Sequence, residues 1–569
     1  MNRLPLLTLF LFIFVVIAKP LAAQNKQGDE NSLLPEIDPQ DIEIRSQFQA
    51  HFPGLRRQPI LGFDPTPRVY QIDPNRKPFM ETPEQVVANL PVSKLSRPEP
   101  PTYVPLKYSS DINAFGRFGI GSYVSPEAKF WGVHRLNPHS YVGGNLDYSS
   151  SDGHLDNQAS SFRFLNANGE YATKLDPKSR LSFDGGIQNS FNQMFDLNPT
   201  SGIPDNARQE YGGFNLGAEF QHFKNSITGW KAQADIRYYQ AKLKNAAQLT
   251  GTGKERVYHA SVAHRWTGNH VNETFTIKAG AKGGNYENNV LSSDHWLTGQ
   301  AGVQYKRLFD YTTNVTADLN VFYTSDLFDN KVYFGPSLKI EQPLLDMLDL
   351  TVKGSAQPYV STVEQLHSQN RFLSVDNTLR HTYRIRGSAE LAIHYASEGT
   401  LNLGIRYEDY TKYPIFMRMA SGNANPDYLF YQVNYMDAYK ARAYVSIAHQ
   451  ILPEKFWFNG KVYVQSPHIK NAGRMPYEEK FGVHSSIGIR PFDKFTLQAW
   501  ANYVGSRQTY QTDTKLKGFL LLGGQLDVQI TGRFGAYVKL VNLLNQDYQI
   551  WQGYTERPFQ AYGGITVKF

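Results

Sequence analysis

The sequence contains no cysteine, and this absence removes several kinds of chemistry at once. A zinc–thiolate site, an iron–sulfur cluster and a cysteine nucleophile all require a cysteine side chain. Disulfide bonds, which stabilise many secreted proteins, are excluded for the same reason. The fold must therefore take its stability from other interactions.

Long apolar runs are scarce as well. The clearest one, Leu6–Ala18, is preceded by Arg3 and followed by small residues that end at Ala23. It is shorter than the ~20 residues of a membrane-spanning helix, and its flanks are typical of a cleavable signal peptide. We therefore predict a signal peptide over residues 1–23 and export of the mature chain. No later run is long enough for a membrane helix, and the mean hydropathy is −0.46.

Dense clusters of one charge are also missing. The 58 basic and 51 acidic residues give a net charge of +7, and the basic residues are scattered. A nucleic-acid-binding face would concentrate them, so we predict no nucleic-acid partner. Aromatic residues are plentiful instead, with 35 Tyr and 35 Phe beside 45 Gly. Many aromatics at low hydropathy are typical of a transmembrane β-barrel, in which only one face of each strand contacts lipid.

Residues 24–112 differ in composition from the rest of the chain. They contain nearly half of the 31 prolines, including the closely spaced set between Pro98 and Pro105. Proline removes a backbone donor and favours extended chain, so this segment is predicted to be irregular. Two interpretations remain open: a periplasmic linker, or a segment that enters the barrel and narrows it.

Residues 113–569 show strand alternation rather than helical spacing. In Val315–Tyr323, for example, Val315, Leu319 and Val321 alternate with Asp318 and Asn320. Apolar residues at every second position predict a strand with one lipid-facing and one wet face. The pattern continues without a helical interlude for too long to be one β-sandwich.

The connections between these strands are alternately tight and long, as in outer-membrane barrels. Tight examples are Leu175–Lys178 and Phe492–Lys494, and the longer stretches are 196–208, 245–255, 362–379, 411–428 and 465–478. At ~10 residues per span the pattern gives about 22 strands, or about 20 or 18 because the segments near Pro414 and Pro426 are weak. We therefore predict an all-β, transmembrane antiparallel barrel, with tight turns facing the periplasm and long loops the exterior.

The C-terminal sequence carries a recognisable motif. Asn542, Leu543, Leu544 and Asn545 form a turn-like stretch, which is followed by Tyr548, Gly553, Tyr554 and a last strand that ends at Phe569. This arrangement resembles the C-terminus of TonB-dependent receptors, although Leu544 stands where Phe is usual. In bacterial barrels the terminal aromatic is read by the assembly machinery, which the resemblance implies as a partner of Phe569.

One departure from that family concerns the plug. Family members carry a globular plug before the barrel, whereas residues 24–112 lack the alternating strands and helices that a plug requires. The chain thus resembles a plugless TonB-dependent-receptor-like barrel of the Bacteroidota type. Its expected location is integral in the outer membrane, in contact with outer-membrane lipid.

Catalytic and metal-binding patterns are not convincing anywhere. A Gly-x-Ser-x-Gly nucleophile elbow is absent, since Gly119–Ser122 does not match it and falls in a predicted strand. His259 and His264 are five residues apart, which places them on opposite faces of a strand and not in one metal site. We predict no catalytic residue, no cofactor, no metal site and no enzymatic function.

Aromatic residues also occupy the polar face, where they have two interpretations. Phe322, Trp457, Tyr463 and Trp500 would either stack on a sugar or a bound chain, or fill volume in a wide lumen. Glycine doublets such as Gly523-Gly524 are interpreted as relief of curvature and room for aromatic neighbours.

Two functions follow from these expectations. The first is a transport or channel component without its own plug, which moves a hydrophilic solute or accepts a partner. The alternative is a structural or accessory subunit of a larger outer-membrane assembly, with other outer-membrane or periplasmic proteins as partners.

Overall fold

The computed structural model describes residues 114–155, 160–194, 208–225, 228–244, 251–270, 272–289, 293–310, 312–396, 398–418, 431–452, 454–510 and 514–569. The predicted signal peptide (1–23) and proline-rich segment (24–112) lie outside these residues. Within the described ranges, no helix is long and apolar enough to cross a membrane.

Strands account for most of the described chain. The first half contains β1 (Ala114–Gly121), β2 (Ser125–Asn137), β3 (Ser140–Ser151), β4 (Phe162–Asp176), β5 (Ser179–Gln193), β6 (Arg208–Phe223), β7 (Gly229–Lys244), β8 (Gly251–Thr267), β9 (Thr274–Glu287), β10 (Asp294–Phe309), β11 (Thr313–Ser325), β12 (Asn330–Leu345) and β13 (Leu348–Val360). The second half contains the helix α4 (Val363–Gln369), then β14 (His381–Ala396), β15 (Gly399–Arg418), β16 (Tyr431–Leu452), β17 (Phe456–Ile469), β18 (Gly473–Arg474), β19 (Phe481–Phe492), β20 (Phe495–Val504), β21 (Arg507–Gln508), β22 (Lys515–Leu516), β23 (Phe519–Gln529), β24 (Phe534–Val541), β25 (Gln549–Trp551), β26 (Tyr554–Thr555) and β27 (Gln560–Lys568).

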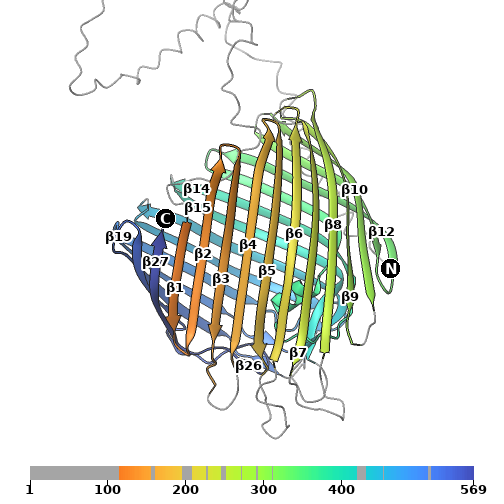
Figure 1. Ribbon diagram of the computed structural model, residues 1–569. Coiled ribbons are helices and arrows are strands. Elements are labelled where there is room, and N and C mark those ends of the chain that lie inside the picture. Colours follow the sequence, from red (N-terminus) through yellow and green to blue (C-terminus); the bar gives the residue numbers. More distant parts are fainter. Residues whose placement is uncertain are drawn as a thin grey trace, which may run out of the picture. The chain divides into compact units, whose positions relative to one another are not determined.

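The large sheet closes on itself as a barrel (Figure 1). Each strand pairs antiparallel with its neighbours, and β1 pairs with β27 from Phe115↔Lys568 to Gly121↔Tyr562. The sheet has 23 strands, of which the short β18 pairs only with β17, so 22 strands form the wall. This confirms the predicted all-β barrel and its strand count. A closed sheet satisfies every wall backbone group, as a lipid environment requires.

The side chains of each strand alternate between the two faces of the wall as predicted. On β11, Leu319 and Val321 are 52% and 50% exposed, whereas the intervening Asp318 and Asn320 are buried. Large apolar side chains are exposed in the same way on strands all around the barrel, for example Ile236, Ile405 and Val538. The outer face is therefore apolar, and the inner face carries the charges and amides.

Tight connections gather at one end of the barrel, called here the tight-turn end, and long ones at the other, called the long-loop end. The first and last barrel residues meet at the tight-turn end, where the Phe569 N–H donates to the Ala114 carbonyl (2.9 Å). The Lys568 N–H donates there to the Arg533 carbonyl in the β23–β24 turn (2.8 Å). Phe569 itself is exposed.

Three of the predicted long connections were placed partly wrong, because the strands are longer than the ~10 residues needed to cross lipid. β15 spans 20 residues and runs through Pro414 as far as Arg418, which shortens the predicted loop 411–428. Likewise, β8 begins at Gly251 and β17 continues to Ile469. Pro414 is tolerated beside a register irregularity between Tyr410 and Tyr413, where a missing backbone donor costs little.

Inner-face aromatics lie against glycines of the neighbouring strand. Trp500 is paired with Gly523, and Tyr463 with Gly482. A Cβ at either glycine would overlap the aromatic ring. Similar overlaps occur for Trp457 over Gly488, Phe322 over Gly335 and Tyr444 over Gly404. The geometry favours the interpretation in which these rings fill space along the wall, since each ring covers a glycine rather than projecting freely.

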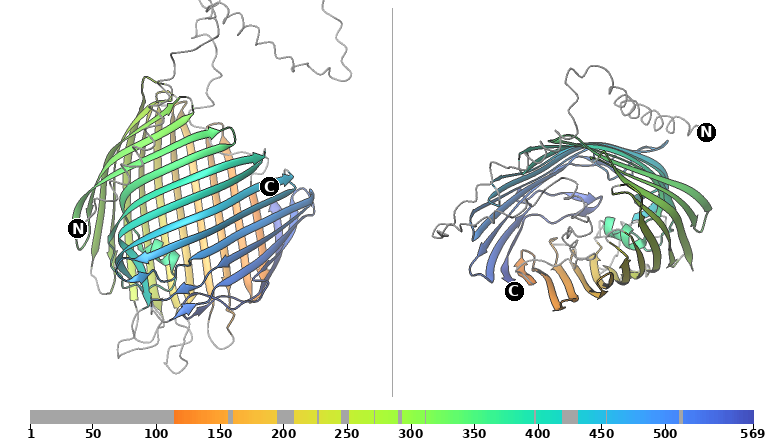
Figure 2. Two further views of the ribbon diagram at one scale, coloured as in Figure 1. Left: turned by 180° about the vertical axis from the view of Figure 1, so that it is seen from behind. Right: turned by 90° about the horizontal axis from the view of Figure 1, so that it is seen from above.

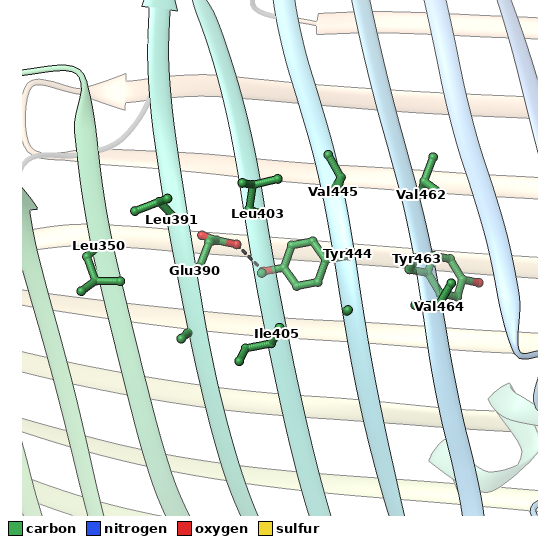
Figure 3. Close-up of a pocket in the computed structure, with 13 residues that line it drawn as sticks. Leu350, Glu390, Leu391, Leu403, Ile405, Tyr444, Val445, Val462, Tyr463 and Val464 are labelled. Carbon is green, nitrogen blue, oxygen red and sulfur yellow. Dashed lines mark hydrogen bonds between the residues drawn. The ribbon is translucent and has the colours of Figure 1, made fainter. Parts of the chain in front are cut away.

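The outer wall over β13–β17 carries a shallow apolar depression (Figure 3). Its lining includes Leu350, Leu391, Leu403, Val445 and Val462. Its apolar lining is what contact with lipid chains requires, and a charge introduced here would be desolvated.

Arginine at Val445 should therefore destabilise the barrel, whereas arginine at the adjacent Ser446 should not. Val445 is 45% exposed on the apolar outer face, and the alternation of β16 directs Ser446 toward the lumen. We expect Val445→Arg to cost about 2 kcal/mol or more and Ser446→Arg less than about 1 kcal/mol. Denaturant unfolding of both variants in lipid vesicles measures the difference. Equal losses would contradict the assignment of the two faces.

Candidate functional site in the barrel lumen

The β13–β14 connection, residues 361–380, folds into the lumen at the long-loop end. Figure 2, right, shows its helix α4 inside the ring of strands. Its apolar side chains join a buried cluster with inner-face residues from the wall. The cluster includes Val363, Leu366, Phe372, Leu373, Val375 and Leu379 from the segment and Tyr239, Val257, Tyr286 and Trp296 from β7–β10. A connection that the sequence predicts as a polar loop is thus a small core inside the barrel, called here the inserted segment.

Local sequence explains why a helix starts in this segment. The Thr362 side chain accepts a hydrogen bond from the Gln365 N–H, and the Gln365 side chain accepts one from the Thr362 N–H (3.3 and 3.1 Å). This reciprocal capping box satisfies donors that a helix start leaves open. Val363 and Leu366 lie one turn apart and are both buried in the cluster. On another face, Glu364 accepts a hydrogen bond from Arg237 on β7 (2.9 Å).

Polar side chains of the wall hold the backbone of the inserted segment at several points. Near its start, Glu255 of β8 accepts from the Val363 N–H (2.7 Å). Near its end, Asp294 of β10 accepts from the Leu379 N–H (3.0 Å). In its middle, Gln209 of β6 donates to the Leu373 carbonyl (2.7 Å). Because buried backbone groups must find partners, these contacts fix one conformation of the segment.

His367 is the buried titratable group at the centre of this packing. It is 4% exposed, and its two ring nitrogens lie 3.1 Å from the Tyr239 hydroxyl and 3.3 Å from the Leu373 carbonyl. A neutral ring fits both contacts by accepting from the tyrosine and donating to the carbonyl. Burial lowers the pKa of His367 to about 4.

Acid should therefore weaken the inserted conformation. The pKa of His367 lies below its ordinary value of 6.5, so the proton prefers a state in which the segment is released. Stability is complete above pH 6.5 and falls as the pH drops from there toward 4. We expect a loss of about 2 kcal/mol between pH 7 and pH 5, measured as lower amide-exchange protection factors of residues 363–379, that is, exchange rates relative to the intrinsic rate at each pH. In His367→Gln, which keeps a donor and an acceptor, this pH response should disappear; its persistence would contradict the assignment.

The stretch that resembles the receptor motif forms the connection after β24. Asn542 and Asn545 have positive φ angles of 53° and 48°, a conformation that asparagine tolerates better than most residues. Asn542 is buried and exchanges hydrogen bonds with the backbone of Gln546 (2.9 and 3.1 Å). Leu543 and Leu544 between the two asparagines are exposed. The asparagines of the motif thus shape a tight turn.

The remaining motif residues extend from this turn toward the lumen. Tyr548 packs on Phe519 at the start of β23 (ring centroids 4.5 Å apart). Gly553, with φ of 89°, makes the turn of the small β25–β26 hairpin. Tyr554 is 1% exposed and stacks on Phe372 of the inserted segment. Of the predicted motif residues, Tyr554 alone joins the buried cluster, and Phe569 lies at the other end of the barrel.

Further contacts join the inserted segment and the connection between β24 and β27 into one layer. Arg371 of the inserted segment forms an ion pair with Glu556 (2.9 Å). Tyr431 at the start of β16 donates from its hydroxyl to the Gln552 carbonyl (2.9 Å). Arg507, in the connection after β20, donates to the Ile550 carbonyl (3.0 Å). Residues from three connections and from the start of β16 therefore cover part of the lumen at the long-loop end.

The two histidines considered for a metal site lie apart. His259 contacts Asp235 of β7 (2.7 Å), whereas His264 stacks on Trp230, whose side chain is half exposed. In the part of the chain that the structure describes, no group of three histidine or acidic side chains is placed to hold a metal ion. Gly119 lies in β1, where a Cβ would overlap the Tyr537 hydroxyl.

Sequence reasoning missed the wall residues that hold the inserted segment. Glu255, Asp294 and Gln209 lie in ordinary strand pattern, and no spacing distinguishes them from other inner-face residues. One signal was available in the segment itself, where Leu373, Val375 and Leu379 are unusually apolar for an exposed loop. Apolar residues in a long connection indicate that it packs against something.

Comparisons with known proteins identify the fold. No family model and no curated protein sequence matches the chain. Solved structures do match: the ferric-catecholate import receptor Fiu of E. coli K12 in its closed form has a TM-score of 0.62 at 10% identity, over 81% of this chain and 82% of that one. The ferripyoverdine receptor of the Pseudomonas aeruginosa outer membrane has 0.63 at 11%, over 81% and 72%. The siderophore receptor PirA of Acinetobacter baumannii has 0.62 at 10%, over 81% and 81%.

Proposed function

We propose that this protein is a transport barrel of the bacterial outer membrane, with its long-loop end facing the exterior. The observation that carries the proposal is a closed barrel with an apolar outer face, a polar lumen and a segment folded into the lumen at its long-loop end. Barrels of 22 strands enclose a lumen that must be plugged or conduct. Residues 361–380 narrow that lumen while the wall keeps polar groups available to a solute.

The similar structures support this proposal. Their names describe receptors that import a ferric catecholate or bind ferripyoverdine in the outer membrane. A shared barrel at this identity supports the transport class and leaves the solute open, since one fold serves many ligands. The solute of this chain must be inferred from its own lumen.

The plugless character is part of the same proposal. Residues 24–112 lack the strand and helix pattern of a globular plug. We propose that the chain resembles TonB-dependent receptors of the Bacteroidota in its barrel and transports without a plug of its own. A cleaved signal peptide over residues 1–23 would export it, and the assembly machinery would read Phe569.

Planar-bilayer conductance of the purified mature protein tests this function beside a variant that lacks residues 24–107. Discrete conductance steps in the variant but not in the full chain would make the proline-rich segment a second restriction and support transport. Equal steps in both would support a passive pore. Absence of conductance in both the full chain and the variant, together with co-purification of other outer-membrane proteins at fixed ratio, would contradict the proposal and favour an assembly subunit.

A further inference from the structure

Five cationic side chains occupy neighbouring inner-face positions on three adjacent strands. They are Arg384 and Arg386 on β14, Arg406 on β15, and Lys440 and Arg442 on β16, called here the arginine wall. These residues alternate with outer-face residues such as Ile405 and Val445, which are exposed to the membrane side. Arg384 follows β14's first residue, His381, by three positions, so the arginine wall begins directly below the inserted segment.

The register of these strands places like charges together. Arg406 lies directly opposite Arg442 across the β15–β16 pair. On the other side of β15, Arg386 lies opposite Glu408, and Arg384 is only two residues further along β14. Like charges directly opposite each other in a sheet repel and destabilise the pair. The repulsion between these cations must therefore be offset by nearby negative charge.

The wall itself compensates only two of the five cations with carboxylates. Arg386 lies 3.6 Å from Glu408, and Lys440 lies 2.5 Å from Glu478. Arg442 donates instead to the neutral Gln465 side chain (2.9 Å). Within the described ranges, no carboxylate lies within 4.0 Å of the guanidinium nitrogens of Arg384, Arg406 or Arg442.

Two of the cations without a carboxylate partner are also partly removed from water. The Nε atoms of Arg384 and Arg406 are buried and have no hydrogen-bond partner in the structure. A guanidinium nitrogen without a partner loses the free energy of its hydration, so a ligand that supplies an acceptor is favoured.

The opposite part of the lumen is built differently. There, several inner-face lysines and arginines have carboxylate partners on nearby strands. Lys231 of β7 pairs with Glu219 of β6 (2.8 Å), Arg180 of β5 with Glu170 of β4 (3.3 Å), and Lys278 of β9 with Asp318 of β11 (2.5 Å). These paired cations contrast with Arg384, Arg406 and Arg442, which face one another without such partners among the described residues.

Aromatic rings orient two of the guanidinium groups. Arg442 lies over the Tyr463 ring at 4.6 Å, and Arg384 lies over the Tyr359 ring at 5.4 Å. A guanidinium that stacks on a ring keeps its N–H groups in the plane of its edge, where planar acceptors bind. At Arg442 the Nε–Nη2 edge already donates to the Gln465 side chain, so an anion would use the remaining N–H groups. The charges are therefore held in place and only partly buried, as a binding surface requires.

We propose that the arginine wall binds an oxyanion solute that carries two or more carboxylate or phosphate groups. Guanidinium groups bind both kinds of oxyanion through paired, charge-assisted hydrogen bonds, and rings of basic residues select anions in pores. Arg406 and Arg442 would share one anionic group, which removes their mutual repulsion, and Arg384 would bind a second. This specificity rests on the proposed transport function, because the solute reaches the wall through the lumen.

Isothermal titration calorimetry of the full-length protein in detergent at low ionic strength tests the proposal with citrate and pyrophosphate as probes. We expect saturable binding of at least one probe and none of the neutral trisaccharide raffinose. The double variant Arg406→Gln/Arg442→Gln should bind at least about tenfold more weakly, as expected when charge-assisted hydrogen bonds are lost. Lys231→Gln, which removes a lumen charge from a compensated pair, should bind like the wild type.

The two probes also separate the two chemistries. Tighter binding of citrate assigns carboxylates, and tighter binding of pyrophosphate assigns phosphates. No binding of either probe to the wild type, or equal affinity in the wild type and the double variant, would overturn the arginine wall as a site. Binding is measured without transport, so the outcome that contradicts the proposed function, absence of conductance in both chains together with co-purifying membrane proteins, would leave this result intact. Thermal unfolding of each variant without probe confirms that the barrel is folded.

Discussion

Replacing residues 361–380 with a two-residue Asn-Gly turn should turn a restricted barrel into an open one. Val360 and His381 are direct register partners on β13 and β14, so the two strands can be joined by the tightest hairpin connection. The wall keeps all of its strand pairing, whereas the buried cluster in the lumen is lost. We expect the largest functional effect here, a conductance rise of at least about tenfold, because a barrel of this size without an obstruction conducts freely.

A second variant separates obstruction by a folded segment from obstruction by mere bulk. In it, residues 363–379 are replaced by a Gly/Ser sequence of equal length, which removes Val363, Leu366 and Leu373 from the cluster. A flexible linker does not pack against β7–β10, so conductance should again rise and become noisy. Unchanged conductance in both variants, with a folded barrel, would show that another part of the chain closes the lumen.

The barrel could be predicted from sequence because its pattern is local. Alternation along one strand, as in Val315–Tyr323, needs only the two-residue period of a pleated strand. The strand count followed from turn spacing. Strand length did not, because ten residues are the minimum that crosses lipid, and nothing local limits how far β15 and β16 extend beyond it.

The inserted segment could not be predicted because its contacts are distant in sequence. Leu373 is held by Gln209, and Phe372 stacks on Tyr554. The helix α4 has seven residues, too few for a helical apolar period to stand out. Only the closed barrel brings these residues together, so the site is a consequence of topology.

The family motif was predictable in part, less fully than the barrel and more than the inserted segment. Resemblance singled out Asn542, Asn545 and Tyr554 without a physical reason. The structure supplies the physical reasons: the asparagines adopt positive φ angles, and Tyr554 contacts the inserted segment. The arginine wall, by contrast, is visible only once the register pairs Arg406 with Arg442.

The closing seam of the barrel depends on one buried carboxylate. Glu127 of β2 accepts hydrogen bonds from the Tyr537 hydroxyl (2.6 Å) and the Lys539 ammonium group of β24. Arg117 of β1 lies 3.9 Å from the same carboxylate and stacks over the Tyr537 ring at 3.6 Å. These contacts reach across β27, where Gly564 leaves room for the tyrosine ring. Side chains of β1, β2 and β24 therefore meet across β27, at the place where the first and last strands pair.

Glu127→Gln should cost the barrel about 3 kcal/mol or more in free energy of unfolding, the largest stability effect that we expect. The Glu127 side chain is only 10% exposed, so its loss leaves Arg117 and Lys539 as uncompensated, partly desolvated cations. Glu170 provides a matched control, since it also binds a tyrosine hydroxyl (Tyr141, 2.7 Å) and an arginine, but it is 45% exposed and away from the seam. Glu170→Gln should cost less than about 1 kcal/mol, as exposed ion pairs do. Urea unfolding in lipid vesicles compares the two variants, and equal losses would show that closure of the barrel relies on backbone pairing of β1 with β27 and not on this carboxylate.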